Sequence, residues 1–72
     1  MNFGERLKEL RIQSGLTQKE LAEKLGVSPT GYAGYEQGYR EPDFKTLVKI
    51  CKTFKVSADY LLGLEDDTGA KQ

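Results

Sequence analysis

TQKELAEKLGVSPTGYAGYEQG, residues 17–38, holds two helix signals that are separated by a very short link. In the first half, Thr17 and Glu20 have the spacing of a capping box, in which each side chain accepts a hydrogen bond from the backbone of the other residue. Gly26 then stands where a glycine commonly ends a helix. The apolar residues between these signals recur at helical spacing: Leu21, Ala22 and Leu25. The pattern predicts a short amphipathic helix over residues 18–25.

The second half of this segment predicts another short helix, over residues 29–37. Ser28 is a favourable N-cap, and Pro29 occupies the first helical position, where proline is preferred. The link between the two helices is only Gly26-Val27-Ser28, and its glycine permits the positive φ of a tight turn. So short a link forces the second helix across the first at a steep angle. This arrangement is a helix-turn-helix, whose second helix can enter the major groove of DNA.

Three more helices are predicted outside this segment. Asn2 and Glu5 form a second capping-box pair, and apolar residues at helical spacing follow them. Asp43 is the expected N-cap of a fourth helix, and Ser57 that of a short fifth helix. Helices of this length are marginal alone in water, so all five must pack together. The apolar residues expected to face the core from the fourth helix are Phe44, Leu47, Val48, Cys51 and Phe54.

The composition of the chain narrows the possible classes of function. Seventy-two residues form one small domain, which we expect to cover residues 1–64, with residues 65–72 as a flexible acidic tail. One cysteine and no histidine leave no disulfide or zinc cluster within the chain, and we expect neither a metal nor a cofactor. No activated nucleophile or phosphate-binding loop is recognisable, so we do not expect an enzyme.

Charge and hydropathy add two further expectations. Residues 1–64 carry ten basic and eight acidic side chains, and the net charge of the whole chain is zero. This balance neither requires nor excludes a nucleic-acid partner. Because no apolar run has the length of a membrane span and no signal peptide is recognisable, we expect a cytoplasmic protein with no membrane partner, associated with the nucleoid when bound to DNA.

Several ordered motifs resemble one known family. GLTQKELAEKLGVS is the most specific of them, and YEQGYREPD, TLVKIC and VSADYLL follow it in order. Through these motifs, residues 6–63 resemble the phage repressor and Cro-like helix-turn-helix family of transcriptional regulators. The resemblance implies an all-α, compact, lambda-repressor-like domain of five helices, with the helix-turn-helix formed by helices 2 and 3. It also implies a homodimer that binds a pseudo-palindromic operator in double-stranded DNA.

The resemblance further implies roles for single residues. Gln18, at the start of the second helix, would contact phosphate and could also contact a base. Thr17 would cap that helix and touch phosphate too. Arg11 and Glu36 match a family pair that forms a buried salt bridge between the first and third helices. The positions that would face the groove are Ser28, Pro29, Thr30, Ala33 and Gly34. The positions that would hold the DNA backbone are Gln37, Gly38, Tyr39 and Arg40, with Lys45 as a further phosphate contact.

The third helix departs from the family pattern on its groove face. Family members usually carry long polar side chains there, whereas Ser28–Gly34 contains no Arg, Lys, Asn or Gln, the residues that read purines bidentately. One interpretation is that Gly31 and Gly34 let the helix lie deep in the groove, so that Thr30, Tyr32 or main-chain atoms meet the bases. The other interpretation is that this helix is poor at direct readout.

Aromatic and leucine side chains leave further alternatives open. Tyr32 could pack in the core while its hydroxyl reaches a phosphate, whereas Tyr35 is expected in the core. Tyr39 could contact phosphate or be simply exposed, and Tyr60 could lie in the core or on a dimer surface. One short helix cannot bury three leucines, so some are expected to close the core and others to contact a second subunit: Leu61, Leu62 and Leu64.

The sequence therefore predicts a sequence-specific transcriptional regulator that represses by occupying its operator as a dimer. An alternative from another class is a protein-interaction module, such as an antitoxin-like or regulatory partner binder on the same scaffold. Zero net charge and the lack of base-reading side chains favour this alternative. The GLTQKELAEKLGVS motif and Arg40 favour DNA.

Overall fold

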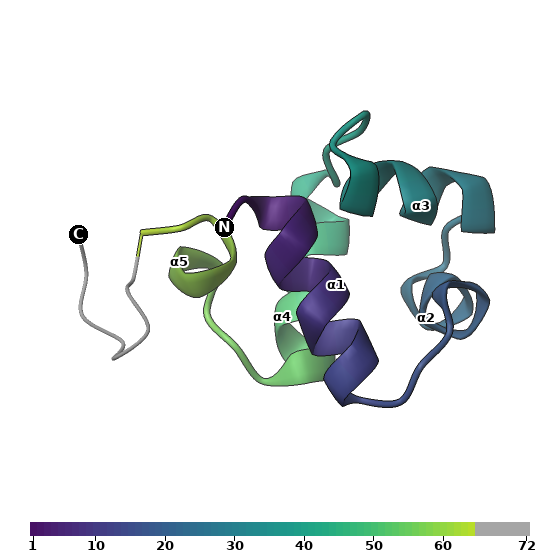
Figure 1. The fold of residues 1–72 in the computed structure, drawn as a ribbon, viewed down its shortest axis with the longest axis horizontal. Coiled ribbons are helices and arrows are strands. Elements are labelled where there is room, and N and C mark those ends of the chain that lie inside the picture. The colour runs from purple at the N-terminus through teal and green to yellow at the C-terminus, as the bar shows by residue number, and fades with distance from the viewer. Residues whose placement is uncertain (65–72) are drawn as a thin grey trace.

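Five α-helices follow one another in residues 1–64, the part of the chain that the computed structural model describes (Figure 1). They are α1 (Phe3–Gln13), α2 (Gln18–Leu25), α3 (Pro29–Gln37), α4 (Phe44–Phe54) and α5 (Ala58–Leu61). The predicted all-helical fold is confirmed for these residues, none of which lies in a strand. The predicted acidic tail, residues 65–72, falls outside the described residues. Within residues 1–64, every helix is too short or too polar to cross a bilayer.

Each helix begins at the N-cap that the sequence predicts. The side chains of Asn2, Thr17, Ser28, Asp43 and Ser57 each accept a hydrogen bond from the backbone N–H three residues on. At α1 and α2 the reciprocal bond of the capping box is present as well. These bonds satisfy N–H groups that have no partner inside the helix, so local side-chain chemistry determines where each short helix starts.

The five helices share one core. α3 packs against α1 and α2, α4 contacts α2 and α5, and α5 also contacts α1. All five contribute side chains to a buried set that is almost free of solvent: Leu7, Leu21, Ala22, Leu25, Tyr32, Ile50 and Leu61. In Figure 1, α2 and α3 lie at one end of the molecule, and α5 and the N-terminus lie at the other. The shared core therefore carries α2 and α3 at one extremity.

α1 and α3 approach each other very closely at Gly4, in the first turn of α1. A β-carbon built on Gly4 would overlap the carbonyl oxygen of Glu36 and lie 2.8 Å from that of Tyr35. Real β-carbons do not come this close to backbone atoms, so glycine is needed for the end of α3 to rest on α1. The sequence suggested a close approach at the glycines of α3, yet this one involves a glycine of α1.

Two residues of α4 that were expected in the core lie outside it. Phe44 is 87% exposed and Val48 is 50% exposed. The buried face of α4 centres instead on Ile50, with Leu47, Cys51 and Phe54 packed against the core. Phe44 and Val48 are four residues apart and share a face of α4 on the other side of the helix from Ile50. They therefore form an exposed apolar pair.

Tyr60 packs at the junction of α5 and α1, and it is half-buried there. The guanidinium carbon of Arg6 lies 5.9 Å from the centroid of the Tyr60 ring, within cation–π range. Nη1 of Arg6 also donates to the backbone carbonyl of Met1. The side chain of Arg6 thus connects the start of the chain to α5.

Candidate nucleic-acid interface

The link between α2 and α3 has the geometry of a helix-turn-helix. Gly26 has a φ of 73°, in the left-handed region that favours glycine. Val27 packs against the core, and Ser28 caps α3. Nζ of Lys49 donates to the carbonyl of Leu25 at 3.3 Å, where the negative end of the α2 dipole lies. These contacts hold α3 at a fixed angle to α2.

α3 turns one face to the core and the other to solvent. Tyr32 and Tyr35 lie on the inner face, and Tyr32 is fully buried. Ser28 and Pro29 are exposed at the start of the helix. The outer face carries residues that follow one another by three and four positions along the helix: Thr30, Ala33 and Gln37. We call this the outer stripe of α3; Thr30 and Gln37 are exposed in it, and Ala33 is half-buried.

The carboxylate of Glu36 is the centre of a hydrogen-bonded cluster that joins α1, α2 and α3. Arg11 donates to it twice, from Nε to Oε2 at 2.7 Å and from Nη2 to Oε1 at 3.3 Å. Nε2 of Gln18 donates to Oε1 at 3.0 Å, and the hydroxyl of Tyr32 donates to Oε2 at 2.5 Å. The predicted ion pair is therefore present, with 12% of the Arg11 side chain and 4% of the Glu36 side chain exposed. We call these four residues the Glu36 cluster.

The Glu36 cluster keeps its carboxyl ionised. Burial raises the pKa of Glu36, but the hydrogen bonds from Arg11, Tyr32 and Gln18 outweigh burial and lower this pKa below its usual range. The hydrogen bond to Glu36 in turn raises the pKa of Arg11. Burial, followed by the hydrogen bond to Glu36, raises the pKa of the Tyr32 hydroxyl. The cluster is therefore a permanently charged structural connection at neutral pH.

The start of α2 offers backbone donors to an anion. Oγ1 of Thr17 accepts from the N–H of Glu20 at 3.0 Å, so its predicted capping role is confirmed. The N–H groups of Gln18 and Lys19 precede the first intrahelical bond and donate to no other described residue. Their position at a helix N-terminus suits a phosphate. Contact of Thr17 and Gln18 with DNA stays a prediction.

The side chain of Tyr32 lies where a duplex could not reach it. The residue is fully buried, and its hydroxyl is bonded to Glu36. Its ring meets that of Tyr35 edge-on, with 6.1 Å between centroids. The prediction that the Tyr32 hydroxyl contacts DNA is therefore wrong, because both the ring and the hydroxyl are enclosed by the protein.

Both glycines inside α3 are buried by groups of the chain itself. A β-carbon on Gly34 would lie 3.1 Å from Cγ, 3.2 Å from Cδ and 3.4 Å from Cβ of Arg40. A β-carbon on Gly31 would lie 3.0 Å from Oγ of Ser28. The stem of Arg40 covers Gly34, and the position of this glycine toward the groove stays a prediction.

Four predicted backbone contacts follow α3, and all are exposed: Gly38, Tyr39, Arg40 and Lys45. The N–H groups of Tyr39 and Arg40 both donate to the carbonyl of Gly34, at 2.9 and 3.2 Å, which anchors the loop to α3. Tyr39 is 83% exposed, so most of its side chain faces solvent. Contact of these four residues with DNA stays a prediction.

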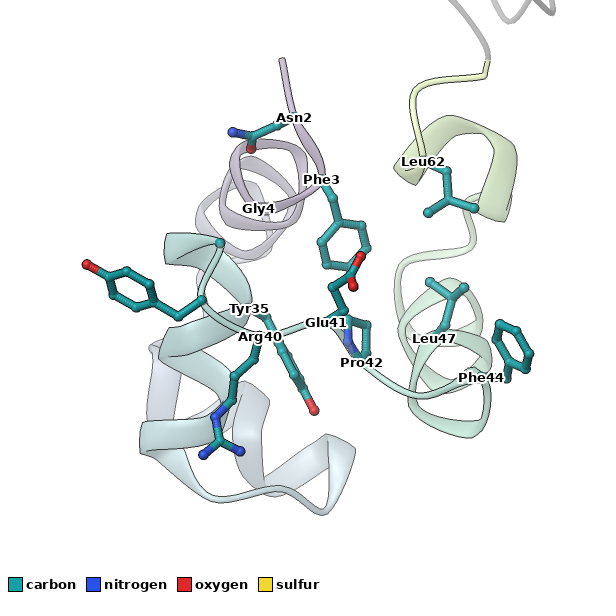
Figure 2. A pocket seen from close by; sticks show the side chains of 12 residues that line it. Asn2, Phe3, Gly4, Tyr35, Arg40, Glu41, Pro42, Phe44, Leu47 and Leu62 are labelled. Carbon is teal, nitrogen blue, oxygen red and sulfur yellow. The ribbon is translucent and has the colours of Figure 1, made fainter.

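An apolar groove of about 580 Å³ opens between the start of α1, the loop after α3, and α4 with α5 (Figure 2). Phe3, Tyr35, Pro42, Leu47 and Leu62 are among the residues that line it, and Phe44 stands at its edge. Of the three leucines that one short helix could not bury, Leu61 lies in the core, whereas Leu62 and Leu64 are 54% and 50% exposed. Phe44 was not among the predicted site residues, although the helical wheel of α4 centred on Ile50 would have indicated its exposure.

Comparison with known proteins relates this arrangement to regulators. A family profile described as helix-turn-helix matches residues 7–61. The HTH-type transcriptional regulator ImmR of Bacillus subtilis (strain 168) is 48% identical over 66 residues, which are 92% of this chain and 52% of ImmR. The P22 c2 repressor, solved with a synthetic operator, has a TM-score of 0.81 at 31% identity and covers 86% of this chain and 94% of its own. A transcriptional regulator from Listeria innocua has a TM-score of 0.83 at 32% identity, over 92% of this chain and 62% of its own. The chain spans about half the length of the curated relatives that it matches.

Proposed function

We propose that this chain, which belongs to the helix-turn-helix family of transcriptional regulators, binds an operator in double-stranded DNA and represses transcription by occupying it. The observation that carries the proposal is the outer stripe of α3, which the short turn after α2 and the Glu36 cluster hold toward solvent. In this position α3 can enter a major groove as the second helix of a helix-turn-helix does. The likeness of the fold to a repressor solved with an operator supports this orientation.

The two sides of α3 suit the two DNA strands that border a major groove. At about 3.6 residues per turn, Glu36 and Gly34 lie on opposite sides of the outer stripe. Gln18 is bonded to Glu36 on one side, and Arg40 packs over Gly34 on the other. The start of α2 therefore accompanies one edge of the stripe, and the loop after α3 accompanies the other. Backbone N–H groups of Gln18 and Lys19, and the side chains of Tyr39 and Lys45, are the proposed phosphate contacts.

A homodimer forms the second element of the proposal, because one module of this size gives limited affinity and two-fold symmetry doubles the contacts. The exposed apolar side chains beside the groove are the surface we assign to a second copy: Phe44, Val48, Leu62 and Leu64. Phe44→Ser should shift sedimentation of the chain toward the monomer. The free energy of unfolding should stay within about 0.5 kcal/mol of wild type, as expected for an exposed site. Unchanged sedimentation of a dimer would place the interface elsewhere.

A mobility-shift titration against a random duplex pool tests DNA binding directly. We expect selection of defined duplexes, with an affinity that falls steeply as salt rises, because phosphate contacts release counterions. Thr30→Glu places a carboxylate in the outer stripe and should weaken binding at least about tenfold by repulsion from phosphates. Thr53→Glu is the matched control, since it adds the same charge to an exposed position of α4. Equal losses for the two variants would contradict the assignment of α3 to the groove.

The apolar groove supports a second candidate, in which the domain binds a protein partner. Under this reading the wild-type chain would select no duplex from the pool, and substitutions in the outer stripe would leave its interactions unchanged. The same titration therefore separates the two candidates.

A further inference from the structure

The side chain of Arg40 lies along α3 and does not extend freely from its loop. Its stem covers Gly34, with three carbons at 3.1 to 3.4 Å from the place where a β-carbon would stand. Its backbone N–H donates to the carbonyl of the same glycine at 3.2 Å. Figure 2 shows the side chain of Arg40 running beside α3. Because Gly34 has no side chain, it leaves a shallow space on the helix surface in which the stem of Arg40 lies. We call this space the seat of Arg40.

The seat borders the outer stripe of α3. Gly34 follows Thr30 by four residues, so the two are neighbours on the helix surface. The guanidinium of Arg40 is exposed and forms no ion pair or side-chain hydrogen bond with any other residue in 1–64. Between Ser28 and Gln37, by contrast, α3 carries no Arg or Lys of its own. The loop thus supplies to this helix face the cation that the helix lacks.

Resting on the proposed function, we infer that Arg40, seated on Gly34, reads a guanine in the major groove. The planar guanidinium presents paired donors that match O6 and N7 of guanine, and this is the commonest specific contact of arginine with DNA. An arm that tracks phosphate needs no seat, because the charge acts from many positions. The seat directs the stem of Arg40 along α3 before binding, which reduces the cost of fixing the guanidinium against one base. The structure thus changes the expected role of Arg40 from holding the backbone to reading sequence.

The test starts from the duplex that the full wild-type chain enriches from a random pool. Each guanine of this duplex is replaced in turn by 7-deazaguanine, which lacks the N7 acceptor. One replacement per half-site should weaken wild-type binding about fivefold or more. Arg40→Ala should bind the natural and the replaced duplex equally. Arg40→Lys, which keeps the charge without the planar fork, should also lose this preference while retaining most of its non-specific affinity.

Two further variants make the result specific. Lys45→Ala removes a proposed phosphate contact, so it should weaken all duplexes alike and lower the salt slope by about one. Gly34→Ala should reduce the guanine preference several-fold, and it should have no such effect when Arg40 is already alanine. A Gly34→Ala effect of equal size in both backgrounds would show that the glycine does not act through the arm.

Other outcomes overturn the inference at separate points. If Arg40→Ala weakens every duplex by the same factor and still distinguishes 7-deazaguanine, Arg40 contacts phosphate only. If the wild-type chain selects duplexes that contain no sensitive guanine, DNA binding stands and the reading role is wrong. If the wild-type chain selects no duplex at all, the proposed function fails, and this inference fails with it.

Discussion

Gly4 and Gly34 are both buried glycines inside helices, but what lies against them differs. Gly4 faces backbone oxygens at the end of α3, which cannot move unless the helix moves. Gly34 faces the stem of Arg40, a flexible and exposed side chain. The same residue type therefore fixes the fold on one side of α3 and leaves room for a movable arm on the other.

The polar groups on the two sides show the same difference. Every described polar partner of Glu36 is bonded and largely enclosed, and the cluster joins three helices. The guanidinium of Arg40 is exposed and forms no ion pair or side-chain hydrogen bond within residues 1–64. A charge that is fully bonded inside a protein positions other groups, whereas a charge without a partner is available to a ligand. We refer to these as the fixed side and the open side of α3.

The largest effect should follow from removing the centre of the fixed side. Glu36→Ala leaves Arg11 buried without its partner, and breaking such a pair costs about 3 kcal/mol or more. Urea unfolding followed by circular dichroism measures this loss. Glu23→Ala, at an exposed position of α2, is the control and should change stability by about 0.5 kcal/mol at most. Similar losses of unfolding free energy in Glu36→Ala and Glu23→Ala would show that the Glu36 cluster does not stabilise the fold.

Gly4→Ala should have the next largest effect. The added methyl overlaps backbone atoms of α3, so the helix must shift, and overpacking of this kind costs about 1 to 3 kcal/mol. The same urea titration applies, with the unfolding free energy compared with that of Gly34→Ala. If Gly4→Ala and Gly34→Ala changed the unfolding free energy equally, it would not matter whether backbone or side-chain atoms lie against the glycine.

Tyr32→Phe tests a single bond of the fixed side. The ring stays packed, and only the hydroxyl that donates to Glu36 is lost, so we expect a destabilisation of about 1 to 2 kcal/mol. Tyr39→Phe, which removes an exposed hydroxyl, should have almost no effect on unfolding. Stability unchanged in Tyr32→Phe would show that Arg11 and Gln18 suffice to satisfy the carboxylate.

Acid should lower the stability that the Glu36 cluster contributes to the fold. Because hydrogen bonds lower the pKa of folded Glu36, the unfolded chain binds this proton at a higher pH than the folded chain does. The stability that Glu36 contributes is therefore fully present above the ordinary glutamate pKa of about 4.3, and it is lost as pH falls below that value. Unfolding free energies measured from pH 7 down to pH 3 should fall less steeply for Glu36→Gln than for wild type. Parallel curves would assign the acid dependence to other carboxylates, such as those of Glu20 and Asp43, whose caps also lower their pKa values.

The smallest effect, and one of opposite sign, is expected on the open side. Gly34 has no positive φ, and alanine is the better helix former by up to about 1 kcal/mol. Because the stem of Arg40 can move aside, Gly34→Ala should raise the urea midpoint slightly. A loss of stability would mean that the stem of Arg40 cannot shift away from the added methyl group.

The caps and the helices were predictable from sequence because they depend on neighbours three or four residues away. An N-cap side chain accepts a hydrogen bond from a backbone N–H in the next turn, as seen at Asn2, Thr17 and Ser28. The role of Gly4 was not predictable, because it depends on where the end of α3 comes to rest. Phe44 was misplaced for a related reason: its spacing fits a helical stripe, but the packing of α4 on α2 selects which stripe is buried.

The candidate site divides in the same way. The pair of Arg11 and Glu36 was anticipated from a resemblance, and the structure contains it. Tyr32 and Glu36 are four residues apart in α3, so spacing makes them neighbours on the helix surface. Spacing does not reveal that the buried Tyr32 directs its hydroxyl to the carboxylate of Glu36. The course of Arg40 over Gly34 depends on how the loop turns back after Gly38, and no local pattern in the sequence specifies it.

The placement of α5 at the end of the molecule away from α2 and α3 has a practical consequence. A fluorescent dye attached to α5 would be carried at the end of the molecule that lies away from α3. Such cargo could report rotational slowing on duplex capture while staying out of the way of the helix that does the reading.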